Sequence, residues 1–235
     1  MTAWRLNDPL PELAWSKDAH DDVGWSVAFD QSGERVATTS LDVCVLETHS
    51  GNLIARLPKQ ELLVTGAAFV PGKNQLVTGG FSGEVIVWDL GRCAPVVVLA
   101  DFPDKVHGLA IDPQGAWLAA ALREGVTALW DLTQPLLEGR APDQLLKTTG
   151  SPVWTLRFSE DGAWLACGDE VGEVQLWRCA DWTRLASFSG DQPMVRNLDF
   201  APGGARLLSS HWGGAAVNWD LNTIRAELVE LGLGF

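Results

Sequence analysis

Few residues in this sequence are of the types that carry metal or catalytic chemistry. The densest group is the segment Asp18-Ala-His-Asp-Asp22, whose carboxylates and imidazole are ligands that divalent metals accept. The alternative interpretation is a solvated loop in which His20 has a structural role. We favour the loop, so the sequence predicts no metal site.

The signatures of the common catalytic classes do not occur in the chain. It has four histidines but no HExxH, and it has no GxSxG, no Walker phosphate-binding loop and no GxGxxG after a strand. Acidic residues such as Asp169, Glu170 and Glu173 are expected to be solvated turn residues. The four cysteines show neither CxxC nor a zinc-binding spacing and are expected to be reduced and unpaired. We therefore predict a protein that is not an enzyme and has no cofactor.

One set of residues, which we call the column, stands out by its varied side chains. Each member lies four residues before an aromatic or apolar residue that ends a predicted strand. The members are Trp25, Thr65, His107, Trp154 and Arg196. A position that only packs should be uniformly aliphatic, whereas Trp, His and Arg anchor protein interfaces. The column is our candidate protein-binding site, and the alternative is that its two tryptophans fill space between structural units.

The elements that must position the column recur along the chain. An apolar strand ends on tryptophan, or once on leucine, at nearly constant spacing. The positions are Trp4, Leu46, Trp88, Trp130, Trp177 and Trp219, in steps of 42, 42, 42, 47 and 42 residues. The residues that end an earlier strand show the same five-residue insertion. These are Phe29, Phe69, Ile111, Phe158 and Phe200. Two markers whose spacing changes at the same insertion indicate an internal repeat.

The sequence pattern of each unit of about 42 residues is typical of four short antiparallel strands. In one copy, Trp154–Phe158 alternates as a strand, the turn Ser159–Gly162 ends on glycine, and Trp164–Cys167 forms a second strand. A second turn carries Gly172, where a positive φ is expected, and the third strand ends on Trp177. A looser fourth strand follows. This arrangement describes a β-propeller blade, so the predicted fold is all-β.

The strand endings also resemble those of the WD40-repeat family. The similar segments are Ser82–Asp89, Gly125–Asp131 and Gly214–Asp220. The structural repeat markers are Trp88, Asp89, Trp130, Asp131, Trp177, Trp219 and Asp220. The resemblance covers about residues 20 to 221 and implies a WD40-type β-propeller of about five four-stranded blades, in a closed or incomplete ring, with a short C-terminal helix.

The resemblance also implies a hydrogen-bonded tetrad of His, Ser or Thr, Asp and Trp in each blade, and here the sequence departs from it. His20 is the one well-placed histidine, and in its blade Leu46 replaces the tryptophan. No blade keeps all four residues. We therefore expect these blades to depend more on apolar packing between neighbours than on buried polar networks.

The repeat predicts the organisation of the chain. Residues 1–24 are expected to supply strands that clasp the last blade, with Pro11–Ser16 beside Val217–Trp219, as the N-terminal segment does in the family. Full blades are expected at 25–63, 64–105, 106–152 and 153–194, three strands of a last blade at 195–221, and a helical tail at 222–235. In the tail, Ile224, Leu228 and Leu231 have helical spacing, and Asn222 or Thr223 is the expected N-cap.

Three outcomes remain open for the ring. In the first, the ring closes at five blades. In the second, it stays an arc that pairs with a second copy or a partner. In the third, the chain is the C-terminal portion of a longer protein. Trp4, a repeat signal without its front half, favours the third outcome as an evolutionary history. The tail is similar to the closing helix of propellers in large bacterial signalling proteins.

Charge and composition narrow the classes of partner. The formal net charge is −13, and an acidic surface repels phosphate groups, so neither nucleic acid nor a membrane is an expected partner. The N-terminus lacks the basic and apolar regions of a signal peptide, which predicts a cytoplasmic location.

The predicted function is a non-catalytic scaffold that binds protein partners with one face of the propeller disc, and self-association is expected if the ring is incomplete. One alternative is a small-ligand or catalytic propeller with a polar site at the central channel. The other is a truncated arc that works only within a larger protein or oligomer.

Overall fold

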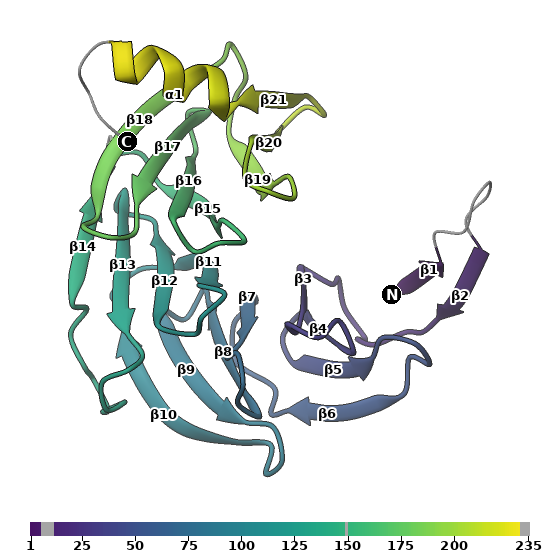
Figure 1. Ribbon diagram of the computed structural model, residues 1–235. Coiled ribbons are helices and arrows are strands. Elements are labelled where there is room, and N and C mark those ends of the chain that lie inside the picture. The colour runs from purple at the N-terminus through teal and green to yellow at the C-terminus, as the bar shows by residue number, and fades with distance from the viewer. Residues whose placement is uncertain (6–11, 149, 231–235) are drawn as a thin grey trace. The chain divides into compact units, whose positions relative to one another are not determined.

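Antiparallel strands that follow one another in sequence make up almost all of the protein (Figure 1). The computed structural model describes residues 1–5, 12–148 and 150–230. Within these residues the chain forms two compact units, Met1–Val106 with Pro135–Ala141, and His107–Gln134 with Pro142–Phe235. The expected all-β fold with four-stranded blades and a short C-terminal helix is confirmed.

The first unit holds one strand pair and two blades. The pair is β1 (Thr2–Arg5) and β2 (Glu12–Ser16). Blade I consists of β3 (Ser26–Phe29), β4 (Arg35–Thr39), β5 (Val43–Glu47) and β6 (Leu53–Leu57). Blade II consists of β7 (Val64–Phe69), β8 (Gln75–Gly80), β9 (Glu84–Asp89) and β10 (Ala94–Asp101).

The second unit holds the strands of three more blades. Blade III consists of β11 (Val106–Ile111), β12 (Trp117–Leu122), β13 (Val126–Asp131) and β14 (Gln144–Lys147). Blade IV consists of β15 (Val153–Phe158), β16 (Trp164–Asp169), β17 (Glu173–Arg178) and β18 (Thr183–Ser189). Blade V consists of β19 (Val195–Phe200), β20 (Arg206–His211) and β21 (Ala216–Asp220), and α1 (Leu221–Glu230) follows it.

Short acidic side chains close the turns that connect these strands. The Asp169 carboxylate accepts hydrogen bonds from the backbone N–H groups of Val171 (3.1 Å) and Glu173 (2.8 Å), which fixes the turn between β16 and β17. Asp169 is buried, with 3% of its surface exposed, so the expectation that it is a solvated turn residue is wrong. A buried carboxylate needs such partners, and the turn N–H groups provide them.

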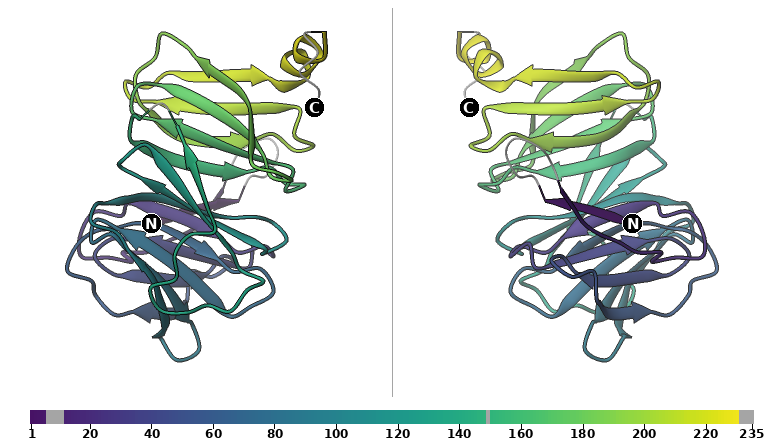
Figure 2. Two further views of the ribbon diagram at one scale, coloured as in Figure 1. Left: turned by 90° about the vertical axis from the view of Figure 1, so that its left-hand side faces the viewer. Right: turned by 90° about the vertical axis from the view of Figure 1, so that its right-hand side faces the viewer.

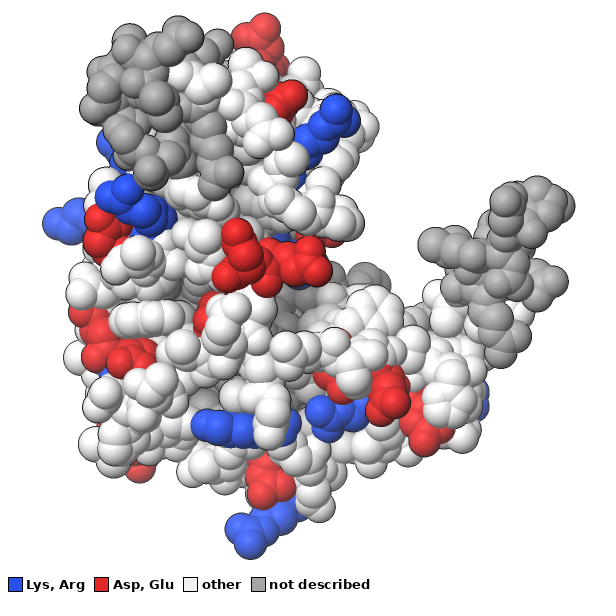
Figure 3. Space-filling view, viewed as in Figure 1, with Lys and Arg blue, Asp and Glu red and all other residues white. Residues whose placement is uncertain are grey.

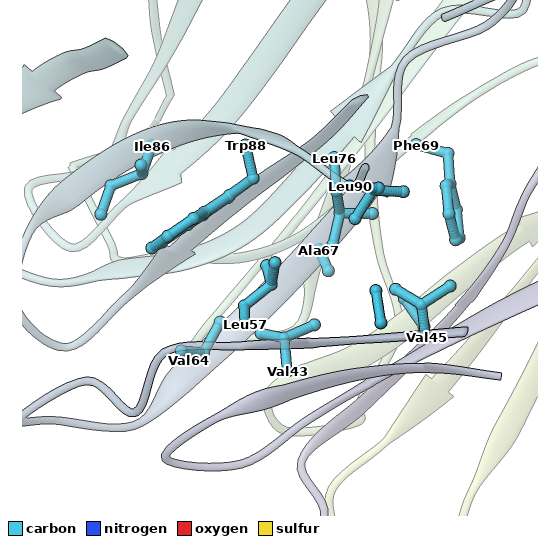
Figure 4. Close-up of a cluster of buried hydrophobic side chains, with 12 residues drawn as sticks. Val43, Val45, Leu57, Val64, Ala67, Phe69, Leu76, Ile86, Trp88 and Leu90 are labelled. Atoms are coloured by element: carbon cyan, nitrogen blue, oxygen red, sulfur yellow. The ribbon is translucent and has the colours of Figure 1, made fainter. Parts of the chain in front are cut away.

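Within each unit, apolar faces of neighbouring blades pack directly against each other. Between blades I and II, Val43 and Val45 of β5 meet Phe69, Leu76 and Trp88 of blade II (Figure 4). Successive side chains of a strand point to opposite faces of its sheet, so one set faces the preceding blade and the other set faces the next. The two central strands of a blade are apolar almost throughout because both of their faces are covered.

The strand pair β1–β2 packs on the face of blade I that points away from blade II. Trp15 is buried there against Val36 and Leu46, and its Nε1 donates a hydrogen bond to the Thr48 carbonyl oxygen at 2.8 Å. β2 pairs with β1, and β21 pairs with β20. Pro11, the first residue of the expected clasp, lies outside the described residues, and the clasp on the last blade stays a prediction.

The C-terminal helix begins one residue earlier than the sequence suggested, directly after β21 (Figure 2). The Asp220 carboxylate accepts hydrogen bonds from the N–H groups of Asn222 (3.0 Å) and Thr223 (3.1 Å), so Asp220 is the N-cap and the expectation of Asn222 or Thr223 is wrong. Leu221 and Ile224 pack on the core of blades IV and V, while the predicted contact residue Leu231 lies outside the described residues. No helix of the described residues is long and apolar enough to span a membrane.

Replacing the helix cap should cost a measurable part of the stability. Asp220→Ala removes the acceptor of two backbone N–H groups, and we expect it to lower the free energy of unfolding by about 1 kcal/mol in urea titration. Asp220→Asn retains an acceptor and should lower the free energy of unfolding by only about a few tenths of a kcal/mol. Equal losses in the two variants would show that the cap does not act through its hydrogen bonds.

Candidate protein-interaction site

Three of the column residues, Thr65, Trp154 and Arg196, lie at the site of a β-bulge in their strands. The pairing register shifts between Val64 and Gly66, between Val153 and Thr155, and between Val195 and Asn197, which leaves Thr65, Trp154 and Arg196 without a paired residue. A bulge turns one side chain out of the alternation of the strand. The bulged side chain therefore leaves the alternation that packs the apolar blade faces together, and this explains its varied residue types.

Three members of the column meet in the second unit. The rings of His107 and Trp154 stack with centroids 4.0 Å apart and an interplanar angle of 28°. The guanidinium carbon of Arg196 lies 6.0 Å from the ring centroid of Trp154 and 5.2 Å from that of Trp212. We call these four residues, His107, Trp154, Arg196 and Trp212, the ladder.

The ladder is buried at its His107 end and exposed at its Arg196 and Trp212 end. His107 is buried, with 7% of its surface exposed, whereas Arg196 is exposed and Trp212 has 61% of its surface exposed. No ion-pair partner of Arg196 occurs among the described residues, so ring faces alone meet its charge. A guanidinium held between aromatic faces keeps its N–H edge available for an acceptor on another molecule.

Backbone hydrogen bonds hold Trp212 beside Arg196. The N–H of Trp212 donates to the carbonyl oxygen of Met194 at 2.9 Å, and the N–H of Met194 donates to that of Glu170 at 3.1 Å. The turn that carries Trp212 continues through Gly213 and Gly214, whose φ values of 96° and 91° suit glycine. The exposed end of the ladder is therefore set by the backbone.

A histidine that the sequence did not single out supports this turn from inside. Trp219 Nε1 donates to Ser209 Oγ at 2.9 Å, Ser209 Oγ lies 2.8 Å from His211 Nε2, and His211 Nδ1 lies 2.8 Å from the Pro193 carbonyl oxygen. This network is comparable to that of His20 in blade I, and His211 provides it from the end of β20. Its position, far from where the family places its histidine, is why the repeat pattern did not reveal it.

The two column members in the first unit behave differently from each other. Trp25 has 40% of its surface exposed and meets Phe81 edge to face at 5.9 Å, and Lys105 Nζ lies 4.2 Å from the Phe81 ring centroid. Thr65 is buried, and its hydroxyl donates to the Val106 carbonyl oxygen at 2.6 Å. Thr65 thus ties two strands together and presents nothing to a partner.

The structural repeat markers lie where they stabilise each blade. Trp88, Trp130 and Trp177 are buried, and Trp219 is partly buried. Trp88 Nε1 donates to Thr78 Oγ1 at 2.8 Å, as Trp219 does to Ser209. The aspartates that follow, Asp89, Asp131 and Asp220, each accept hydrogen bonds from the backbone of the next turn.

The segment around His20 forms an ion-pair network. His20 Nδ1 lies 2.5 Å from Asp42 Oδ1, and His20 Nε2 lies 3.3 Å from Thr38 Oγ1. Arg56 forms an ion pair with the same Asp42, and the Cys44 thiol donates to the Ala19 carbonyl oxygen at 3.2 Å.

His20, Asp42 and Cys44 are close enough to share a metal, but their donor atoms are already used within the protein. A guanidinium on the carboxylate opposes a bound cation, and burial raises the pKa of the Cys44 thiol to about 11, so it is not a thiolate at neutral pH.

Comparison with known proteins agrees with the repeat. The family model "WD domain, G-beta repeat" matches residues 45–89 and 143–178. Each match ends with the third strand of a blade and includes the fourth strand of the blade before it. The sequence repeat therefore links neighbouring blades.

Several curated proteins are similar to this chain. WD repeat-containing protein 55 of Mus musculus is 22% identical over 165 residues, which are 69% of this chain and 41% of that protein. Telomerase protein component 1 of Rattus norvegicus is 27% identical over 67% of this chain and 6% of its own length. Small ribosomal subunit protein RACK1y of Oryza sativa subsp. japonica is 25% identical over 65% of this chain and 45% of its own length.

The chain spans about two fifths of the length of WD repeat-containing protein 55. These relatives are eukaryotic, so the likeness of the tail to bacterial proteins remains an expectation from the sequence. The recurring strands, the four-stranded blades and the matches to the repeat agree with one another, and they support the similarity of this chain to the WD40-repeat family of β-propeller proteins.

Proposed function

We propose that this protein is a non-catalytic scaffold that binds a protein partner through the exposed end of the ladder, Arg196 and Trp212. The observation that carries the proposal is the guanidinium of Arg196 between the rings of Trp154 and Trp212. Arginine and tryptophan are the residues most enriched at energetically dominant positions of protein interfaces.

Rigidity supports this proposal as much as residue type does. The inner end of the ladder is buried, and the turn that carries Trp212 is hydrogen bonded to the loop before β19. Side chains that are ordered before binding lose little conformational entropy when a partner arrives. An exposed, ordered Trp–Arg pair is therefore suited to recognition.

The experiment is affinity capture with the purified chain as bait, followed by titration of each captured protein. We expect Arg196→Ala and Trp212→Ala each to weaken binding by about tenfold or more, because each removes a ring or a charge from the contact. Arg206→Ala is the matched control, since Arg206 is exposed on β20 of the same blade.

Both ladder side chains are exposed, so thermal unfolding of the variants should match that of the wild type. A partner whose affinity is unchanged by either ladder variant would contradict the proposed site.

A further inference from the structure

A groove of about 460 Å³ lies between the first turns of blades I and II, and the first unit alone forms it. Blade I lines it with Asp30, Ser32 and Arg35 from the turn between β3 and β4. Blade II lines it with residues 69–74, which include the turn between β7 and β8. More than half of the lining residues are polar or charged, unlike the mostly apolar pockets that enclose small molecules.

Arg35 is held in this groove by contacts from both blades. Its Nε donates to Asp30 Oδ2 at 2.9 Å, and its Nη1 donates to Asn74 Oδ1 at 2.9 Å. Its guanidinium carbon lies 5.0 Å from the ring centroid of Phe69. Nη2 has no hydrogen-bond partner in the part of the chain that the structure describes. The guanidinium is therefore ordered in advance and can donate from Nη2 to a bound acceptor.

The lining carries one unbalanced positive charge. Burial raises the pKa of Asp30, but hydrogen bonds from the backbone and side chain of Arg35 and from Ser32 bring it below its ordinary value, so the carboxylate stays charged at neutral pH. Asp30 thus balances Arg35. Lys73 forms no ion pair within the described residues, and its charge is left over.

This local excess of positive charge contrasts with the formal net charge of −13 for the whole chain. On the face shown in Figure 3, acidic and basic side chains are interspersed with uncharged surface. An acidic partner would therefore be recognised at a local basic site and not by a broad electrostatic field.

Lys73 and Asn74 depart from the repeat at this place. They lie four and five residues after Phe69, which ends β7. Blades III, IV and V have the dipeptide Gly-Ala there, at Gly115-Ala116, Gly162-Ala163 and Gly204-Ala205. The turn forms in those three blades without a charged or amide side chain, so its geometry does not require Lys73 or Asn74.

Between blades III and IV the chain itself occupies the corresponding space. Gln114 holds the place of Ser32, three residues after the end of the first strand, and its Nε2 donates to the Asp161 carbonyl oxygen at 3.4 Å. A Cβ on Gly162 would overlap the Gln114 amide. Ser32 is shorter, and its hydroxyl donates to Asp30 of its own turn at 3.0 Å, so the space between blades I and II stays open.

We propose that this groove binds an acidic side chain, glutamate or aspartate, of a partner protein. Arg35 Nη2 and the Lys73 ammonium group donate to the carboxylate, whose single charge balances that of the lining. A phosphate group would bring nearly two negative charges to a site with one to balance. The groove is a second binding site, separate from the ladder, and it goes beyond the scaffold function proposed above.

The test is a titration of the full chain with a short peptide in low-salt buffer, followed by two-dimensional proton–nitrogen NMR. The probe is acetyl-Gly-Ser-Glu-Ser-Gly-amide, and the matched control peptide has glutamine in place of glutamate. We expect the glutamate peptide to cause saturable shifts of the amide signals of Ser32, Gly72 and Asn74, which line the groove. The glutamine peptide should cause none.

Two variants separate the charge of the groove from its shape. Lys73→Glu reverses the unbalanced charge and should weaken binding by about tenfold. Ser32→Gln keeps the charge but fills the space as Gln114 does, and it should weaken binding by about tenfold as well. Lys59→Glu is the matched control, because it changes the net charge equally at an exposed residue outside the groove, and it should leave the affinity unchanged.

Each other outcome overturns the proposal. The absence of saturable shifts, or equal affinity of wild type and Ser32→Gln, shows that the groove is not the site. Equal affinity for sodium acetate shows that it takes an adventitious ion only. Tighter binding of the same peptide with phosphoserine in place of glutamate assigns the groove to a dianion.

Two further variants keep the test decisive. The amide spectrum of each variant reports its folding, and Lys73→Gln replaces Lys73→Glu if the latter alters the fold. Arg196→Ala should leave the affinity for the glutamate peptide unchanged. That result separates the groove from the ladder, so either proposal can fail without the other.

Discussion

Gly83→Ala is expected to lower the free energy of unfolding by about 3 kcal/mol or more. Gly83 lies in the turn between β8 and β9 with a φ of 88°, a region that residues with a Cβ rarely adopt. A Cβ there would also overlap the carbonyl oxygen of Phe102 and lie 3.0 Å from that of Asp104. The backbone of Phe102 cannot withdraw freely, because its N–H donates to the Gly83 carbonyl oxygen at 3.0 Å.

A second glycine of the same blade separates the two causes. Gly72 has a φ of 70°, and a Cβ at that position would meet nothing within 4 Å. Gly72→Ala should therefore cost only the conformational part, about 1 kcal/mol. Urea unfolding of the two variants measures the difference. Equal losses would show that the approach of the 102–104 backbone does not constrain Gly83.

The same comparison shows what the sequence reveals about these turns. The repeat places glycine in the turn before the third strand of several blades, and a positive φ could be predicted there from the turn type. Gly172 has the same φ of 88° and meets the backbone of Gln192. The close approach of a loop some twenty residues away depends on tertiary packing, which the local pattern does not encode.

The fold itself was predictable because each blade is a local structure. Strand alternation, turn residues and the 42-residue step all lie within a single repeat, and neighbouring repeats bury each other's faces. Burial of polar residues was less predictable. Asp169 looked like a solvated turn residue and is buried, because its carboxylate satisfies the turn beneath it.

The candidate site was predictable only in part. The varied residue types of the column marked His107, Trp154 and Arg196, which the structure brings together, and the bulges in β15 and β19 explain that variety for Trp154 and Arg196. Trp212 was missed because its side chain meets Arg196 across a turn, and no spacing rule links the two positions. Thr65 shares the bulged position yet is buried, which its short side chain and its bond to Val106 explain.

Ser209→Ala should cost about 2 to 3 kcal/mol in the free energy of unfolding. Ser209 is 1% exposed, and its hydroxyl contacts both Trp219 Nε1 and His211 Nε2. The alanine variant leaves the buried His211 ring and the partly buried Trp219 Nε1 without that partner, and this penalty exceeds the value of an ordinary exposed hydrogen bond. Urea unfolding followed by tryptophan fluorescence measures the loss. A change below about 0.5 kcal/mol would show that Trp219 and His211 find other partners.

A substitution in blade IV that adds a hydroxyl, Cys167→Ser, tests the same interaction, and here the free energy of unfolding is expected to rise. Cys167 holds the place of Ser209, because Leu165 pairs with Trp177 as Leu207 pairs with Trp219. Trp177 Nε1 is buried without a hydrogen-bond partner among the described residues. Burial raises the pKa of Cys167 to about 12, so it remains a neutral thiol and a weak acceptor. Cys167→Ser supplies a hydroxyl at this place and should raise the free energy of unfolding by about 1 kcal/mol. A loss of stability would mean that the Trp177 ring does not direct its N–H toward position 167.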